Sequence, residues 1–270
     1  MNGKSSVQIR ESFFNAKDVR LNFAESPKSG PSLLLLHGGS ARWQDFGGII
    51  PDLAANWHLF MPDFRGHGKS DWAAGHYRLQ DYADDIIAFL QRQVREPVFI
   101  FGHSLGGMIA LLVAAQLPVY VKAVVVGDSP LSAETWYTVI DQSRERFIRW
   151  QQLTGGQRSL EDVTAIVQNE WVARNLYYND PAMMAALLDD FDNMTVGYDM
   201  NLVLPLIQCP VLLLQADPSV GGLMSDLEVE QAMALLARPS HVQLKNVNHA
   251  LQNDQKQPIL QAINDYFRSL

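Results

Sequence analysis

The chain has 270 residues, of which 47% are hydrophobic and 19% charged, and its formal net charge is −8 at pH 7. A dispersed acidic balance excludes the clustered Lys and Arg of a nucleic-acid-binding surface and favours a neutral ligand over an anionic one. The single cysteine, Cys209, has no second cysteine to pair with and is interpreted as a small buried hydrophobe.

Residues 1–6 are polar, and no apolar segment typical of a signal peptide follows them. The most apolar stretch, residues 105–126, is interrupted by Gln116, Pro118 and Lys122, which favours a buried helix followed by a buried strand over a membrane span. We therefore expect a cytoplasmic protein that neither crosses a membrane nor binds nucleic acid. A monomer and a homo-oligomer are both compatible with this composition.

Short apolar runs alternate with longer stretches of helical periodicity, which predicts βαβ units and a mostly parallel sheet. Two strand-like stretches within residues 7–24 are expected to form an antiparallel ribbon at the sheet edge. Asp84 and Asp85 are interpreted as one solvated helix face. The further predicted strands are 32–36, 59–61, 98–101, 121–126, 211–214 and 241–244, and the predicted helices are 79–94, 108–117 and 258–270.

Residues 131–204 lie between two predicted strands but differ from the rest of the chain. They have helical character, many aromatic side chains and no clear strand run. We expect residues 1–130 and 205–270 to form an α/β core domain, and residues 131–204 to be a helical cap inserted in it. One or two of the aromatic side chains of the cap are expected to line an apolar pocket.

The strongest motif is Gly102-His103-Ser104-Leu105-Gly106, which lies between a predicted strand and a predicted helix. In that context G-x-S-x-G indicates a sharp turn that exposes the serine hydroxyl, and glycine is needed on both sides because a side chain would collide with the turn. The N-terminus of the following helix directs backbone N–H groups toward developing negative charge. Ser104 is the candidate nucleophile.

A serine hydroxyl needs a base that takes its proton. Of the seven histidines, His249 follows the last predicted strand and precedes the closing helix, so it can reach Ser104 across the carboxyl edge of the sheet. The acid that orients this imidazole is expected to be Asp217, which follows the strand 211–214 and fits the chain order Ser, acid, His. Asp128 and Asp226 remain alternatives; Asp226 also fits a helix-capping box.

The oxyanion of an acyl-transfer intermediate requires two backbone N–H donors. Leu105, directly after the candidate nucleophile, is expected to supply the first. Gly39, in His37-Gly38-Gly39 after the strand 32–36, is expected to supply the second, with Ser40 as the alternative.

The sequence resembles the α/β-hydrolase superfamily, specifically its small soluble esterases, lactonases and C–C-bond hydrolases. The resemblance rests on four segments that occur in this order: His37-Gly38-Gly39, Asp63-Phe64-Arg65-Gly66-His67-Gly68-Lys69-Ser70, Gly102-His103-Ser104-Leu105-Gly106 and the late His249. The resemblance implies an eight-stranded core sheet, a helical cap, no cofactor or metal, and a structural turn at residues 65–70. Two positions depart from the pattern. Gln215-Ala216-Asp217 replaces the usual Gly-x-x-Asp, and Asn246 and Asn248 replace glycines before the base.

The sequence therefore predicts a serine hydrolase of the carboxylesterase or lactonase type, acting on a small, neutral, apolar ester or lactone. A serine rather than an aspartate at the elbow favours acyl transfer over displacement at carbon. Two alternatives stay open. The same fold and triad could serve C–C-bond hydrolysis, lyase or perhydrolase chemistry, or the fold could be a ligand receptor without catalysis.

Overall fold

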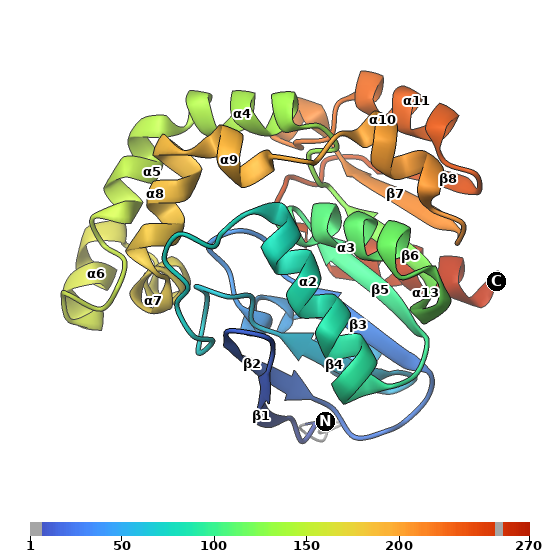
Figure 1. The fold of residues 1–270 in the computed structure, drawn as a ribbon, viewed down its shortest axis with the longest axis horizontal. Helices are drawn as coiled ribbons and strands as arrows, with labels where there is room; N and C mark the ends of the chain where they lie inside the picture. Colours follow the sequence, from blue (N-terminus) through green and yellow to red (C-terminus); the bar gives the residue numbers. More distant parts are fainter. Residues whose placement is uncertain (1–6, 252–255) are drawn as a thin grey trace.

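The computed structural model describes residues 7–251 and 256–270 of the chain, so the predicted core domain is described apart from residues 1–6 and 252–255. Within the described residues the chain forms an eight-stranded sheet with the order β1-β2-β4-β3-β5-β6-β7-β8 (Figure 1). The strands are β1 Arg10–Asn15, β2 Arg20–Glu25, β3 Ser32–Leu36, β4 His58–Pro62, β5 Val98–His103, β6 Val121–Gly127, β7 Val211–Ala216 and β8 Pro239–Leu244.

The sheet is mostly parallel, as predicted. β1 and β2 form the expected antiparallel ribbon at one edge, and β2 also pairs antiparallel with β4. From β4 to β8 all neighbouring strands are parallel, with Leu36 of β3 beside Gly102 of β5 and Gly127 of β6 beside Leu214 of β7. β3 lies between β4 and β5, so the next two strands of the chain are added on opposite sides of β3. Ligands of open α/β sheets bind at the carboxyl ends of the strands where the strand order reverses in this way.

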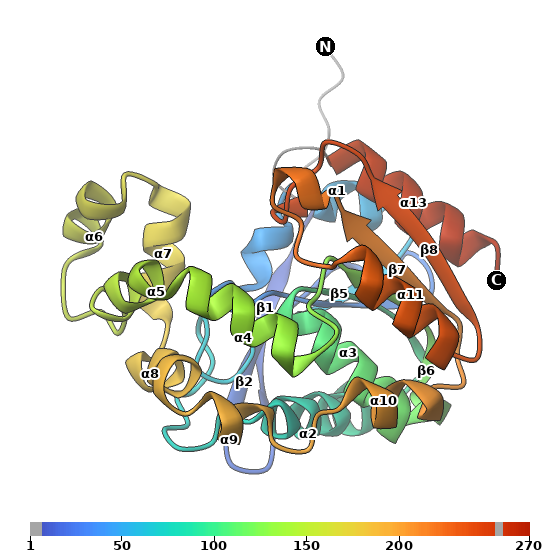
Figure 2. The ribbon, with the colours of Figure 1, turned by 90° about the horizontal axis from the view of Figure 1, so that it is seen from above.

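Helices cover both faces of the sheet, which explains why β3 and β4 are buried along their whole length (Figure 2). One face packs on α2 (Leu79–Phe89), α3 (Leu105–Gln116) and α11 (Asp226–Leu235). The other face packs on α1 (Ile50–Leu53) and α13 (Lys256–Arg268). The two apolar cores on either side of the sheet fix the carboxyl ends of the strands in place.

The segment between β6 and β7 is helical, and Figures 1 and 2 show it as a row of helices that extends beyond one end of the sheet. Its buried side chains Trp136, Met183 and Met194 join the same apolar core as α3. No helix among residues 7–251 and 256–270 is long and apolar enough to cross a membrane. The helices are α4 Ala133–Gln142, α5 Arg144–Gln151, α6 Leu160–Val167, α7 Glu170–Tyr178, α8 Pro181–Asp189, α9 Phe191–Thr195 and α10 Met200–Val203.

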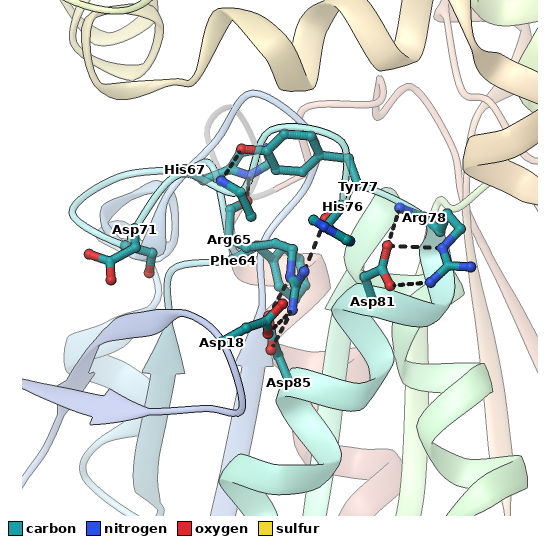
Figure 3. A network of polar contacts seen from close by, with 12 residues as sticks. Asp18, Phe64, Arg65, His67, Asp71, His76, Tyr77, Arg78, Asp81 and Asp85 are labelled. Carbon is teal, nitrogen blue, oxygen red and sulfur yellow. Dashed lines mark hydrogen bonds and ion pairs between the residues drawn. The ribbon is translucent and has the colours of Figure 1, made fainter.

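A buried ion pair anchors the loop after β4 to helix α2 (Figure 3). The guanidinium of Arg65 donates from Nε and Nη2 to the two carboxylate oxygens of Asp85, at 2.7 and 2.8 Å, and from Nη1 to the carbonyl of His76 at 3.0 Å. Arg65 and Asp85 are both nearly inaccessible, whereas Asp84 is exposed. The interpretation of Asp84 and Asp85 as one solvated face is therefore wrong for Asp85, which faces inward because Arg65 requires a partner there.

Removing the Asp85 carboxylate should destabilise the fold. In Asp85→Ala the buried Arg65 guanidinium loses its bidentate partner and keeps only the half-exposed Asp18, whose Oδ1 lies 3.4 Å from Nη2. A buried pair broken in this way costs about 3–5 kcal/mol. Asp84→Ala is the matched control on the adjacent, exposed position, and we expect it to change stability by less than about 0.5 kcal/mol. Urea unfolding followed by circular dichroism measures both; equal effects of the two substitutions would contradict the buried-pair assignment.

Candidate active site

Ser104 occupies the sharp turn between β5 and α3, with φ 54° and ψ −123°, a backbone conformation that side-chain-bearing residues rarely adopt. Glycine is required on both sides of this turn. A Cβ on Gly102 would lie 2.2 Å from the carbonyl oxygen of Gly106, and a Cβ on Gly106 would lie 2.1 Å from that of Leu36. The predicted steric reason for G-x-S-x-G is therefore present in the structure.

Asp128 makes the principal contact with the His249 ring. The Nδ1 atom of His249 lies 2.7 Å from Oδ2 of Asp128, and because a carboxylate accepts only, Nδ1 carries the proton and donates. In a neutral imidazole this hydrogen bond fixes the tautomer, with the proton on Nδ1 and the lone pair on Nε2. The His249 side chain is 32% exposed while that of Asp128 is fully buried, so the ring bridges the interior and the solvent side.

Asp128 lies directly after β6, is fully buried and has φ 39°. Besides His249, its carboxylate accepts hydrogen bonds from the backbone N–H groups of Ala216, Leu223 and Met224, at 3.1, 2.9 and 3.2 Å. Burial alone would raise the pKa of this carboxyl, but the hydrogen bond and the charge of His249, together with the backbone donors, outweigh it and lower the pKa. Asp128 is thus held as a carboxylate.

Asp217 is bound elsewhere, which corrects the expectation that it orients His249. Its Oδ1 accepts from the backbone N–H and the hydroxyl of Ser219, at 2.9 and 2.6 Å, and its Oδ2 accepts from the backbone N–H of Asn246 at 2.8 Å. The physical reason is local. Pro218 starts a short 3-10 turn after β7, and the preceding aspartate caps it.

Asp226 is also bound away from the imidazole. It is the first residue of α11, where Ser225 and Glu228 form the predicted capping box, and it accepts from Nε2 of Gln215 at 2.8 Å. Sequence reasoning held Asp128 only as an alternative. The signal that favoured it was the Gly-Asp-Ser-Pro turn at the end of the strand beside the elbow strand.

Two buried histidines connect the loop after β3 to the loop after β4. His37 Nε2 accepts from the backbone N–H of Phe64 at 3.0 Å, and His67 Nε2 accepts from that of Ser40 at 3.2 Å. Their Nδ1 atoms lie 2.8 and 2.9 Å from the carbonyls of Gly38 and Arg65 and donate to them. Burial lowers the pKa of His37 well below its usual value and that of His67 to about 4, so both rings are neutral.

The backbone N–H of Ser40 is therefore engaged by His67, whereas Gly39 and Leu105 both line the space above Ser104. A Cβ on Gly39 would meet no atom within 4 Å, which means that this residue borders open space. Leu105 is the first residue of α3, where helix N–H groups have no partner within the helix. Of the two sequence-based choices for the second donor, Gly39 is the one whose N–H His67 leaves available.

His103 ties the elbow to the loop that carries His249. Its Nε2 lies 2.8 Å from the carbonyl oxygen of His249 and donates to it, and the two rings are tilted by 33° with centroids 4.8 Å apart. Burial, with the neighbouring His249 charge, lowers the pKa of His103 to about 3, so this ring is a neutral structural link.

Ser104 and His249 face a cavity with two lobes, which also share Gly39, Ser40 and Trp150. The larger lobe, about 360 Å³, lies under α4, α5 and α8 and is walled mainly by apolar side chains, including Trp136 and Phe147. The smaller lobe, about 230 Å³, extends toward α7 and is bordered by Trp171, Asn175 and Asp45. One or two aromatic side chains of residues 131–204 were expected to line a pocket, and four do: Trp136, Phe147, Trp150 and Trp171.

Asp45 is the acidic side chain of the smaller lobe, and it could not be predicted from the sequence because it belongs to no motif. Nδ2 of Asn175 donates to both of its carboxylate oxygens, at 3.1 and 3.2 Å, and Nε of Arg42 donates to Oδ1 of Asn175 at 2.8 Å. Burial raises the pKa of Asp45 to about 6 despite these hydrogen bonds. Among the described residues, no group of three or more His, Cys, Asp or Glu side chains has the arrangement of a metal site.

The sequence model of the alpha/beta hydrolase fold matches residues 31–201, which is more than half of the chain. The chain belongs to the alpha/beta hydrolase family.

Among curated relatives, this hydrolase is 31% identical over 164 residues to the 2-(acetamidomethylene)succinate hydrolase of Mesorhizobium japonicum, covering 61% of this chain and 55% of that protein. It is 40% identical over 94 residues to the magnesium-chelatase 30 kDa subunit of Rhodobacter capsulatus, covering 34% of this chain and 33% of that protein. The chain thus spans from about a third to just over half of the length of these relatives.

Solved structures share the fold across almost the whole chain. An E-2-(acetamidomethylene)succinate hydrolase matches with a TM-score of 0.80 and 20% identity, covering 97% of this chain and 100% of that one. An esterase from Exiguobacterium antarcticum matches with a TM-score of 0.75 and 17% identity, covering 96% of this chain and 100% of that one. An N-acyl homoserine lactonase matches with 0.74 and 19%, covering 97% of each chain. These neighbours are hydrolases.

Neutral His67 should make the stability of this hydrolase depend on pH. Between pH 6.5 and pH 4 the unfolded chain binds a proton at His67 that the folded chain does not. The contribution of His67 to the free energy of unfolding is therefore lost as the pH falls. His67→Gln keeps an acceptor for Ser40 but cannot be protonated. The stability advantage of the native chain over this variant should therefore shrink by about 3 kcal/mol from pH 7 to pH 4.

Urea unfolding at several pH values measures this difference. His76→Gln is the control, because His76 is exposed in the loop before α2. A difference between the native chain and His67→Gln that stays constant over this range would show that His67 is not held neutral in the fold.

Proposed function

We propose that this alpha/beta hydrolase cleaves a carboxylic ester or a lactone through an acyl-enzyme on Ser104, with a triad of Ser104, His249 and Asp128. The observation that carries the proposal is the 2.7 Å hydrogen bond between His249 Nδ1 and a buried Asp128, beside the cavity that Ser104 borders. It supports an imidazole with a free Nε2, which is what a general base for a serine requires. Asp128 replaces Asp217 in this role.

In the proposed reaction the Ser104 hydroxyl oxygen attacks the carbonyl carbon, and His249 Nε2 takes its proton. Asp128 holds the imidazole and stabilises its protonated form. The N–H groups of Gly39 and Leu105 bind the oxyanion, each contributing about 3 kcal/mol of transition-state stabilisation. The imidazolium then gives the proton to the leaving oxygen. Water enters, gives a proton to His249 and attacks the acyl carbon, and His249 then returns this proton to Ser104 Oγ as the bond to the acyl group breaks and the acid leaves.

Residues 131–204 are proposed to be the cap of this site. The two lobes support a division of the substrate, because α4, α5 and α8 border the larger lobe while α7 borders the smaller one. The apolar larger lobe suits an acyl group, whereas Asp45 and Asn175 give the smaller lobe a polar wall suited to a leaving group with hydrogen-bonding atoms.

Amide hydrolysis is the second candidate, because the Mesorhizobium relative is named for a substrate with an acetamido group. The same serine chemistry serves both, since the proton that His249 holds goes to the leaving nitrogen instead of oxygen. Anilides with the same acyl groups as the test esters distinguish the two. Turnover of the anilides alone would favour the amide candidate, and absence of turnover with both would favour C–C-bond or receptor functions.

A fluorophosphonate probe should label Ser104 covalently in the folded protein, because the probe reacts with serines that a base activates. Intact-mass and peptide spectrometry locate the adduct. Ser104→Ala should remove labelling and ester turnover while leaving the unfolding midpoint within the range of a surface substitution. Labelling of a different residue, or none in folded protein, would refute the proposal.

Asp128→Asn should lower kcat by about three to four orders of magnitude, because the amide leaves His249 in the wrong tautomer while the cavity stays intact. Asp217→Asn is the matched control, since it makes the same change on the neighbouring strand end, and kcat should stay within about twofold of the native value. Steady-state ester hydrolysis measures both. A large loss with Asp217→Asn and none with Asp128→Asn would restore Asp217 as the triad acid.

A further inference from the structure

The larger lobe of the cavity combines apolar walls with one cation. Its wall includes Val139, Ile140, Met183, Leu187 and Met194, and among the described residues that border it Arg146 carries the one permanently charged side chain. A cavity of this kind buries hydrocarbon well but leaves an anionic group unsolvated unless that group reaches the arginine.

Arg146 lies on α5 against two of the aromatic side chains of the lobe. Its guanidinium carbon is 5.4 Å from the ring centroid of Phe147 and 5.4 Å from that of Trp150, and these two rings pack edge to face. Nη2 donates to Ser143 Oγ at 3.0 Å. The rings therefore hold the guanidinium against the cavity wall and leave most of its five N–H donors for a ligand.

Arg146 has no carboxylate at ion-pair distance within residues 7–251 and 256–270. Its neighbour Arg144 differs, because it donates to the carbonyl of Leu188 at 2.9 Å and pairs with Asp189 at 3.4 Å. Helix α5 carries three arginines and one glutamate in a chain whose formal net charge is −8. Arg146 is thus a cation on the wall of the lobe that no carboxylate of the described residues neutralises at ion-pair distance.

We propose that the natural acyl group ends in a carboxylate, which Arg146 binds at the rim while the intervening carbon chain lies in the apolar lobe. This inference rests on the proposed function. An arginine fork and a carboxylate match in geometry, and their charge-assisted hydrogen bonds are about twice as strong as neutral ones. A substrate with a carboxylate at the end of its acyl group replaces the wholly neutral substrate expected from the net charge, because a net charge does not say where single charges lie.

The test compares mono-aryl esters of adipic, pimelic and suberic acids with the same esters whose far carboxyl is methylated. Shorter half-esters are avoided because their own carboxylate attacks the ester efficiently. The native hydrolase should prefer the charged member of at least one pair. Arg146→Gln should lower kcat/KM for that charged ester about 10- to 100-fold and change the methylated ester less than about twofold. Arg146→Lys should keep part of the preference.

Arg149→Gln is the matched control, because it removes the same charge from an exposed position of the same helix that does not border the lobe. It should leave the ratio of the charged to the methylated ester unchanged within about twofold. An equal effect of Arg146→Gln and Arg149→Gln would overturn the proposal in favour of a long-range field. A native preference for the methylated esters would overturn it as well.

A binding measurement separates this inference from the proposed chemistry. Titration calorimetry of the half-esters with Ser104→Ala, with and without Arg146→Gln, reports recognition without turnover. Binding that depends on Arg146 in a protein that labels at no serine and cleaves no ester would sustain the carboxylate site and overturn the proposed reaction. Ester turnover by the native protein, together with binding that does not change in Arg146→Gln, would sustain the proposed reaction and overturn the carboxylate site.

Discussion

The hydrogen bond between buried Asp128 and His249 is the interaction on which the rest of the site depends. It joins the end of β6 to the loop after β8, and three backbone N–H groups from the β7 strand and the following loop complete the surroundings of the carboxylate. A buried carboxylate is costly unless it is satisfied in this way. The four hydrogen bonds offset the cost of burying the Asp128 carboxylate, and one of them fixes the imidazole of His249, which faces the cavity above Ser104.

Neutral histidines connect the remaining parts of the site. His37 and His67 accept backbone N–H groups of the two loops, and His103 donates to the carbonyl of His249. His37 and His67 each use one ring nitrogen as a donor and the other as an acceptor, and burial keeps all three rings uncharged. Arg65 and Asp85 secure the second loop to α2 from below. The site is therefore positioned by buried hydrogen bonds and a buried ion pair rather than by surface ion pairs.

The sequence predicted the sheet and the elbow well because both have strong local causes. Continuous apolar runs mark strands covered on both faces. The two glycines around Ser104 are required because backbone atoms lie about 2 Å from where a Cβ would be. The acid was harder, because the ends of β6 and β7 both carry an aspartate at the same edge. Which one meets His249 depends on local capping, and Ser219 and Asn246 draw Asp217 away. Arg146 and Asp45 belong to no motif. The placement of α5 brings Arg146 to the cavity, and Asp45, in the turn after β3, becomes part of the smaller lobe because α7 places Asn175 against it.

A crystal structure of the protein after reaction with a phosphonate is the most direct test of this arrangement. The account predicts a phosphorus–oxygen bond to Ser104 Oγ, a phosphonyl oxygen within hydrogen-bond distance of the N–H groups of Gly39 and Leu105, and an unbroken contact between His249 and Asp128. An adduct whose oxygen points away from both N–H groups, or an imidazole that has turned to Asp217, would contradict it.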